Sequence, residues 1–223
     1  MTTTKGPRGG RPAGLTRERI VDTAITILDS DGERGLTFRS LALKLQTGHG
    51  AIQWHVASKG ELLVAAAVGA LTQALQEPAK GTPPRLAVRA VALGVFEALD
   101  AHPWLGAQLF AVPWQPAVVQ LWEHVGRPLE ELGVPQDMLF TAVSTLVSYI
   151  VGVGSQNAMN TQAAAGRCSR DEVLSAVAAR WASLDPATYP FVTRIAGQLR
   201  VHDDRQEFLA GIDIFLNGLS EAR

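Results

Sequence analysis

Apolar residues recur at helical spacing along the chain, and this periodicity constrains the fold more than any other feature. Between residues 20 and 28 they stand at i, i+4, i+7 and i+8, on one face of a helix. Residues 208–219 repeat the pattern at i, i+4, i+7 and i+11. No segment of useful length alternates with the period of two that is typical of strands. The sequence therefore predicts an all-α fold.

The composition is that of a folded chain without covalent or metal cross-links. Of its 223 residues 47% are hydrophobic and 18% are charged, so a sizeable core can form. The single cysteine, Cys168, permits neither an intramolecular disulfide nor a four-cysteine zinc site. No secretion signal is recognisable. We expect a cytoplasmic protein with no cofactor and no metal.

One segment is long and uncharged enough to span a bilayer. It contains 29 residues without an acidic or basic side chain, between Asp137 and Arg167. Serine, threonine, asparagine and glutamine are spread through it, and only its first half is strongly apolar. We therefore expect a helix of the core or of a dimer interface, and no membrane association.

Basic residues are concentrated in the first quarter of the chain. Residues 1–61 hold nine basic and six acidic residues, a net charge of +3, whereas residues 62–223 have a net charge of −4. Residues 1–15 are rich in glycine and proline and carry Lys5, Arg8 and Arg11. A flexible basic arm of this kind can follow phosphates or enter a minor groove. Because the charge is small, an unstructured terminus with incidental charge remains the alternative.

Residues 16–61 have the pattern of three short helices and the start of a fourth. Thr16 and Thr37 can cap the first two helices, which end near residues 32 and 45. A short third segment covers residues 49–55, and the S-x-x-E sequence at 58–61 is a capping box for a long helix. Two short helices joined by a tight turn predict a helix-turn-helix, whose second helix enters the major groove of DNA.

Three polar side chains of this region have chemistry suited to DNA. Gln53, on the short third segment, can pair bidentately with adenine. Arg39, near the start of the second helix, can reach a guanine or a phosphate. Lys59, at the start of the fourth helix, suits a phosphate.

Three ordered motifs run through residues 16–63. They are Gly35-Leu36-Thr37-x-Arg39-x-Leu41-Ala42-x-Lys44-Leu45, Ile52-x-Trp54-His55-Val56 and Ser58-Lys59-x-Glu61-Leu62-Leu63. Together they resemble the DNA-binding domain of the TetR family of bacterial transcriptional regulators, and they are most like the tetracycline repressor type. The resemblance implies a larger C-terminal helical domain, here residues 62–223, that binds a ligand and forms a homodimer.

The resemblance also implies roles for single residues. Arg39 matches a base-contacting arginine, and positions 49 and 50 match groove-facing positions of the recognition helix. Trp54 is expected to pack against the third helix, with at most its edge on the sugar-phosphate chain. The complete set of expected DNA contacts is Thr37, Arg39, Thr47, His49, Gly50, Gln53, Trp54, His55 and Lys59, with Lys5, Arg8 and Arg11 of the arm.

Three positions depart from the family pattern. Gln46 stands where a glycine usually makes the turn, and Gly48 follows two residues later. Gln53 replaces a tyrosine, and Gly50 replaces a larger residue. Glutamine favours adenine by hydrogen bonding. We therefore expect a half-site unlike that of the tetracycline repressor.

Two late helices, near residues 136–160 and 203–219, are expected to form the dimer interface, as the resemblance implies. The first carries small residues that permit close approach, and the second carries an apolar stripe. The candidates are Ser144, Ser148, Gly152, Phe208, Ile212, Phe215 and Leu219. The alternative is that these residues fill the core of one subunit.

Aromatic and polar residues in the middle of the chain are candidates for an effector site. Such residues suit a small hydrophobic ligand, although core packing remains the alternative. The candidates are Phe96, His102, Trp104, Phe110, Trp114, Trp122, Met138, Tyr149 and Asn157, and His124 is a further polar one. Residues 62–77 contain no histidine to match the tetracycline site, so we expect a different effector.

These observations predict a ligand-responsive repressor. It would bind a two-fold symmetric double-stranded DNA operator as a homodimer, and a small hydrophobic effector would release it. The alternative is a small all-helical enzyme or carrier of an apolar ligand. Motifs of serine hydrolases, zinc proteases and P-loop enzymes are missing from the sequence, and neither alternative requires the basic helix-turn-helix.

Overall fold

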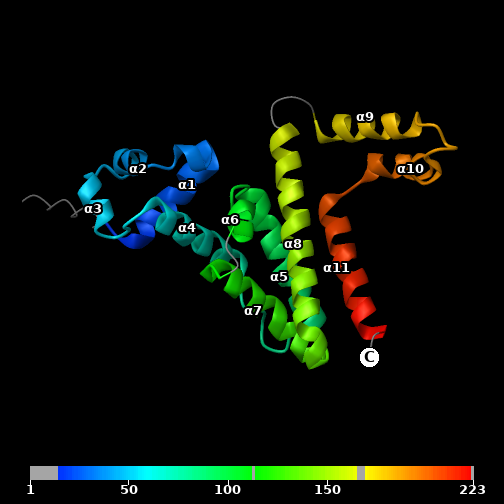
Figure 1. The fold of residues 1–223 in the computed structure, drawn as a ribbon, viewed down its shortest axis with the longest axis horizontal. Helices are drawn as coiled ribbons and strands as arrows, with labels where there is room; N and C mark the ends of the chain where they lie inside the picture. Colours follow the sequence, from blue (N-terminus) through cyan, green and yellow to red (C-terminus); the bar gives the residue numbers. More distant parts are fainter. Residues whose placement is uncertain (1–14, 112–113, 165–168, 222–223) are drawn as a thin grey trace, which may run out of the picture. The chain divides into compact units, whose positions relative to one another are not determined.

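The chain folds into helices joined by short connections (Figure 1). The computed structural model describes residues 15–111, 114–164 and 169–221, and every regular element in these ranges is helical. This confirms the predicted all-α class. Helices group into two compact units, which meet between Ala66 and Ala67 within α4 (Lys59–Ala74).

The first unit contains α1 (Arg17–Gly35), α2 (Phe38–Leu45), α3 (His49–Gln53) and the start of α4. The side chain of Thr16 accepts a hydrogen bond from Arg19 N–H, and that of Thr37 accepts one from Ser40 N–H. Both predicted caps are therefore present. Apolar side chains from all four helices fill the core of this unit: Ile20, Ala24, Ile27, Leu28, Leu36, Leu41, Ile52, Val56 and Leu62.

Regular helical geometry in α1 is interrupted at Gly32, where the sequence predicts the end of the helix. Its φ of 66° lies in the left-handed region that glycine adopts without strain. One further turn then continues to Gly35. At the start of α4, Glu61 N–H donates to the Ser58 hydroxyl over 3.1 Å, and the Glu61 carboxylate accepts from Ala57 N–H over 2.9 Å. In a capping box the Glu61 carboxylate would accept from the N–H of the cap residue, Ser58. Here it accepts from the residue before it, Ala57.

The turn between α2 and α3 is made by a non-glycine residue in the left-handed conformation. Gln46 has φ 51° and ψ 47°, whereas Gly48 has an ordinary φ of −81° and caps α3. Thr47 N–H donates to Ala42 C=O over 3.0 Å, and Gln46 N–H donates to Leu43 C=O over 3.3 Å. This is a Schellman motif, whose left-handed position usually holds glycine.

Replacing Gln46 by glycine should therefore stabilise the protein. A left-handed conformation costs a residue with a Cβ about 1 kcal/mol, so Gln46→Gly should raise the free energy of unfolding by up to that amount. Urea denaturation of the full-length chain measures the change. Gln46→Ala is the control, because it removes the amide and keeps the Cβ. An equal gain in both variants would show that the amide, and not the backbone, is responsible.

The second unit is built around one long helix. It comprises the rest of α4, α5 (Pro84–Ala101), α6 (Leu105–Ala111), α7 (Pro116–Glu131), α8 (Gln136–Ala164), α9 (Arg170–Ala182), α10 (Pro190–Ile195), a 3₁₀ turn (Ala196–Val201) and α11 (Asp204–Glu221). Helix α8 contacts α5, α6, α7 and α11 (Figure 1). Helix α9 lies beside α10 and the 3₁₀ turn.

Helix α8 corresponds to the uncharged segment of the sequence. Among the described helices it alone is long and apolar enough to cross a membrane. Some of its apolar side chains, including Leu146 and Ile150, are buried against the neighbouring helices of the unit, whereas Phe140 and Met159 are exposed.

The apolar stripe of α11 is part of the subunit core. Phe208 and Ile212 have 1% and 0% of their surface exposed. The Phe208 ring stacks on Phe96, with centroids 4.6 Å apart, and on Tyr149 at 5.6 Å. The Tyr149 hydroxyl donates to Phe208 C=O over 3.1 Å. The expectation that Phe208 and Ile212 form a dimer interface is therefore wrong, because their side chains are already covered by the same subunit.

The remaining candidates for the interface stay accessible. Ser148 is exposed, and the other four, Ser144, Gly152, Phe215 and Leu219, are partly exposed. Two large apolar side chains of the same helices are also exposed, Phe140 of α8 by 72% and Ile214 of α11 by 73%. These residues can contribute to an interface between subunits, and that assignment remains a prediction.

Candidate nucleic-acid interface and regulatory pockets

Helix α3 presents a polar arc to solvent and one apolar residue to the core. His49, Gly50, Gln53 and Trp54 are exposed, and their spacing of i, i+1, i+4 and i+5 places them on one side of the helix. Ile52, which points to the other side, has 0% of its surface exposed. A short helix anchored in this way keeps its outer side chains available to a partner.

The start of α2 contributes to the same unit two further residues of the expected interface, Thr37 and Arg39. Both are exposed. Within the described part of the chain the Arg39 guanidinium has no hydrogen-bond or ion-pair partner, and neither has the Gln53 amide. The ring of Phe38 stacks on that of His49, with centroids 5.1 Å apart and planes inclined by 27°. This contact fixes the first residue of α3 against the first residue of α2.

Lys59 has a structural partner that the sequence did not reveal. Its ammonium donates to Glu33 C=O over 2.6 Å and lies 4.0 Å from the Glu33 carboxylate. Lys59 therefore connects the end of α1 to the start of α4. An ammonium has three donors, so the expected phosphate contact remains possible on the partly exposed side. Thr47 and His55 are likewise partly exposed.

The first turns of α1 and α4 are joined by a second ion pair. Arg17 Nη2 donates to Glu61 Oε1 over 3.3 Å. The hydrogen bond from Ala57 N–H, followed by that from Arg17, lowers the pKa of the Glu61 carboxyl. Glu61 therefore takes part both in the cap of α4 and in the ion pair with Arg17.

Trp54 does not pack as expected. Its side chain is 88% exposed, because Ile52 and Val56 on either side of it fill the available core positions. Leu43 of α2, which the sequence did not single out, is 80% exposed. Only its position off the Leu41–Leu45 face could have indicated this. The arm residues Lys5, Arg8 and Arg11 lie outside the described residues.

The expected effector residues do not line one common cavity. Phe110 and Trp114 are 62% and 79% exposed, and Phe96 is packed against Phe208. Others form pairs in separate places. The ring centroids of Trp122 and Phe140 are 5.4 Å apart, and those of His102 and Trp104 are 5.9 Å apart. Met138 is partly exposed. Helix packing distributes these rings over several interfaces of the described residues, and the effector site stays a prediction.

Two pockets beside α8 and α11 bring together three of the expected residues. One, of about 260 Å³, is bordered by Tyr149 and Asn157, and the other, of about 530 Å³, by Phe96 and Asn157. Both are also bordered by His202 and Asp204, which the sequence analysis did not identify. No sequence motif marks these two residues, which lie where α11 begins.

His202 is held between two carboxylates. Its Nε2 lies 2.7 Å from Asp204 Oδ1, and its Nδ1 lies 2.7 Å from Glu207 Oε1. Arg170, the first residue of α9, donates to Asp204 over 2.9 Å and to His202 C=O over 2.8 Å. Partial burial lowers the pKa of His202, but the hydrogen bonds and charges of Glu207 and Asp204 outweigh it and raise the pKa above its ordinary value.

Stability should therefore fall as the pH rises above the ordinary histidine pKa of about 6.5. The protonated His202 stabilises the folded chain fully below that value, and the contribution disappears as the pH rises through the raised pKa of the folded state. Urea midpoints measured from pH 5.5 to pH 8.5 (roughly the window in which histidine titrates) test this. His202→Gln should flatten the decline, and an unchanged pH profile in this variant would contradict the assignment.

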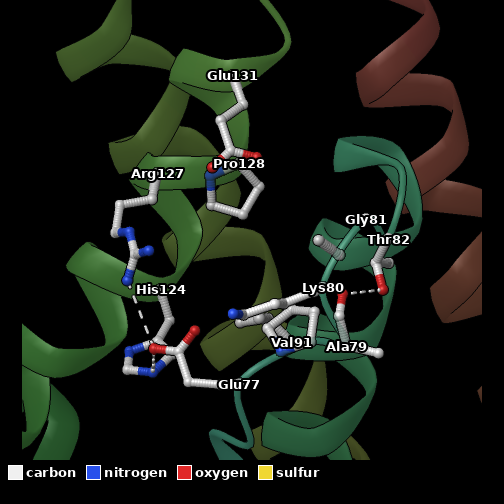
Figure 2. Close-up of a pocket in the computed structure, with 12 residues that line it drawn as sticks. Glu77, Ala79, Lys80, Gly81, Thr82, Val91, His124, Arg127, Pro128 and Glu131 are labelled. Atoms are coloured by element: carbon white, nitrogen blue, oxygen red, sulfur yellow. Dashed lines mark hydrogen bonds and ion pairs between the residues drawn. The ribbon is translucent and has the colours of Figure 1, made fainter.

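A third pocket, of about 470 Å³, lies between α7 and the segment that joins α4 to α5 (Figure 2). Glu77 Oε1 accepts from Arg127 Nη1 over 3.4 Å and lies 3.7 Å from His124 Nε2. His124 Nδ1 is 2.8 Å from Gln120 C=O, which identifies it as the donor nitrogen. His124 was a polar candidate in the sequence, whereas Glu77 and Arg127 were not identified there. Among the described residues no cluster suits a metal ion.

Comparison with known proteins shows similarity along both units. The family described as Tetracyclin repressor-like, C-terminal domain, matches residues 77–223. The solved structure of the transcriptional regulator SCO7222, a TetR from Streptomyces coelicolor, is 47% identical, with a TM-score of 0.85 over 93% of this chain and 99% of that one.

Two further proteins from Streptomyces are similar to this chain. The structure of ActR of Streptomyces coelicolor in complex with actinorhodin is 25% identical, with a TM-score of 0.75 over 94% of this chain and 99% of that one. The HTH-type transcriptional repressor DrrR1 of Streptomyces coeruleorubidus is 29% identical over 65% of this chain. The match spans about half of that relative, 54% of its length.

Proposed function

Because the chain belongs to the tetracycline-repressor-like, or TetR, family of transcriptional regulators, we propose that it represses transcription by binding a two-fold symmetric operator as a homodimer. A small-molecule effector bound in the second unit would release it. The protein would act in the cytoplasm, as a regulator and not as an enzyme.

Exposed polar side chains of α2 and α3 carry this proposal. Arg39 and Gln53 are exposed side chains with rigid hydrogen-bonding ends, and both are without partners in the described part of the molecule. Buried Ile52 and the Phe38–His49 stack hold the backbone that bears them. Preformed donors and acceptors on an anchored helix are suited to reading base edges in the major groove.

A dimer places two such helices on one face of DNA. Half-sites read by paired recognition helices lie about 34 Å apart, one turn of the double helix. An effector releases DNA only if it binds more tightly to a conformer in which this spacing is wrong. The same coupling requires that operator DNA weaken effector binding by an equal factor.

Arg39→Ala should weaken binding to the operator by about 1–3 kcal/mol if the guanidinium reads a base. Arg39→Lys is the matched variant, because it keeps the charge and loses the bidentate geometry. Fluorescence anisotropy with operator DNA and with a scrambled duplex measures both affinities. We expect Arg39→Lys to lose operator affinity and keep its affinity for the scrambled duplex. If this variant binds both duplexes like the wild type, Arg39 contacts only phosphate.

A further inference from the structure

The pocket between α7 and the α4–α5 segment combines an apolar floor with a rim of basic and acidic side chains. Ala87 and Val91 of α5 are 5% and 2% exposed, and Pro128 of α7 is buried beside them. Lys80, His124 and Arg127 border the opening. A volume of about 470 Å³ falls within the range of small-molecule sites.

Two acidic residues, Glu77 and Glu131, line the pocket together with the three basic ones. Figure 2 shows the Lys80 ammonium pointing across the pocket, toward the side of α7 that bears His124 and Arg127. Lys80 has no hydrogen-bond or ion-pair partner among the described residues. The Glu77 carboxylate lies between Arg127 and His124. A carboxylate group therefore already occupies the cationic side of the pocket.

Glu77 is held only weakly in this position. Its distances to Arg127 and His124, 3.4 and 3.7 Å, exceed the 2.7–2.9 Å of strong charge-assisted hydrogen bonds. Its side chain is 67% exposed. Exposed ion pairs of this kind shift an equilibrium by no more than about fivefold. A ligand that brings its own carboxylate and an apolar body can replace it.

We propose that this pocket binds a small apolar carboxylate, whose anionic group displaces Glu77 from Arg127 and meets Lys80. The apolar body of the ligand would lie on Ala87, Val91 and Pro128. As the effector site, the pocket rests on the proposed function of a ligand-released repressor. The proposal narrows the effector from an unspecified hydrophobic compound to an anionic one.

The position of Glu77 connects this exchange to α4. Glu77 follows the last residue of α4, Ala74, by three positions, and Thr72 of α4 lies 3.4 Å from Gln120 of α7 through its hydroxyl. The Glu77–Arg127 pair and this hydrogen bond hold the end of α4 to α7. Helix α4 begins in the first unit, so displacement of Glu77 loosens the end of a helix that both units share.

Calorimetric titration of the full-length protein tests the site without DNA. The probes are 2-naphthoate and octanoate, and 2-naphthamide is the uncharged control. Glu77→Gln should bind the two carboxylates about two- to fivefold more tightly, since the competing anion is gone. Arg127→Gln should bind them at least about tenfold more weakly, since a charge-assisted hydrogen bond is lost.

Arg205→Gln is the matched control. Arg205 pairs with Glu97 over 3.2 Å and is 58% exposed, close to the 54% of Arg127, but it borders a different pocket. This variant should bind the carboxylates like the wild type. The proposal is overturned if neither carboxylate binds, if the amide binds equally well, if Glu77→Gln gains nothing, or if Arg205→Gln loses as much affinity as Arg127→Gln.

An operator titration with 2-naphthoate present separates this proposal from the proposed function. We expect the probe to lower the operator affinity of the wild type. The operator affinity of Arg127→Gln should be the same with and without the probe. Binding of the probe without any change in operator affinity would overturn its role as an effector. Failure to bind any operator when the probe is absent would instead contradict the proposed function, and the calorimetric result would stand apart from it.

Discussion

The turn between α2 and α3 sets the direction of every side chain that the first unit offers to DNA. It is closed by the left-handed Gln46 and by the two hydrogen bonds of the Schellman motif. The turn places Ile52 in the core, and the i, i+1, i+4, i+5 arc of α3 then faces solvent. A shift of one residue in this turn would rotate α3 by about 100° and bury part of the polar arc.

Local rules of the sequence predicted most of the fold. Thr16 and Thr37 cap the helices that their positions indicate. Ser169 caps α9 in the same way, and Pro84 and Pro190 are the first residues of α5 and α10. Capping and proline effects act over a few residues, so they can be read directly from the chain. The same rules predicted the helix-turn-helix, but not the exposure of Trp54.

Contacts between distant segments could not be predicted from these local rules. Phe208 shows the periodicity of an interface helix and of a core helix equally well, and only Phe96 and Tyr149 determine that it is core. Lys59 lies next to Glu33 and His202 lies next to Glu207 because separate helices end and begin there. Aromatic composition likewise indicated a ligand site without indicating where, and one of the charged pockets instead forms around Glu77 and Arg127.

Selection from a random pool of double-stranded DNA with the purified full-length protein tests the central claim most directly. Sequencing the bound fraction should reveal a two-fold symmetric motif with half-sites about one helical turn apart. Adenine should be enriched where Gln53 reaches the groove. Uniform, salt-sensitive binding without any motif, or no binding at all, would contradict the account of α3 as a sequence-reading helix.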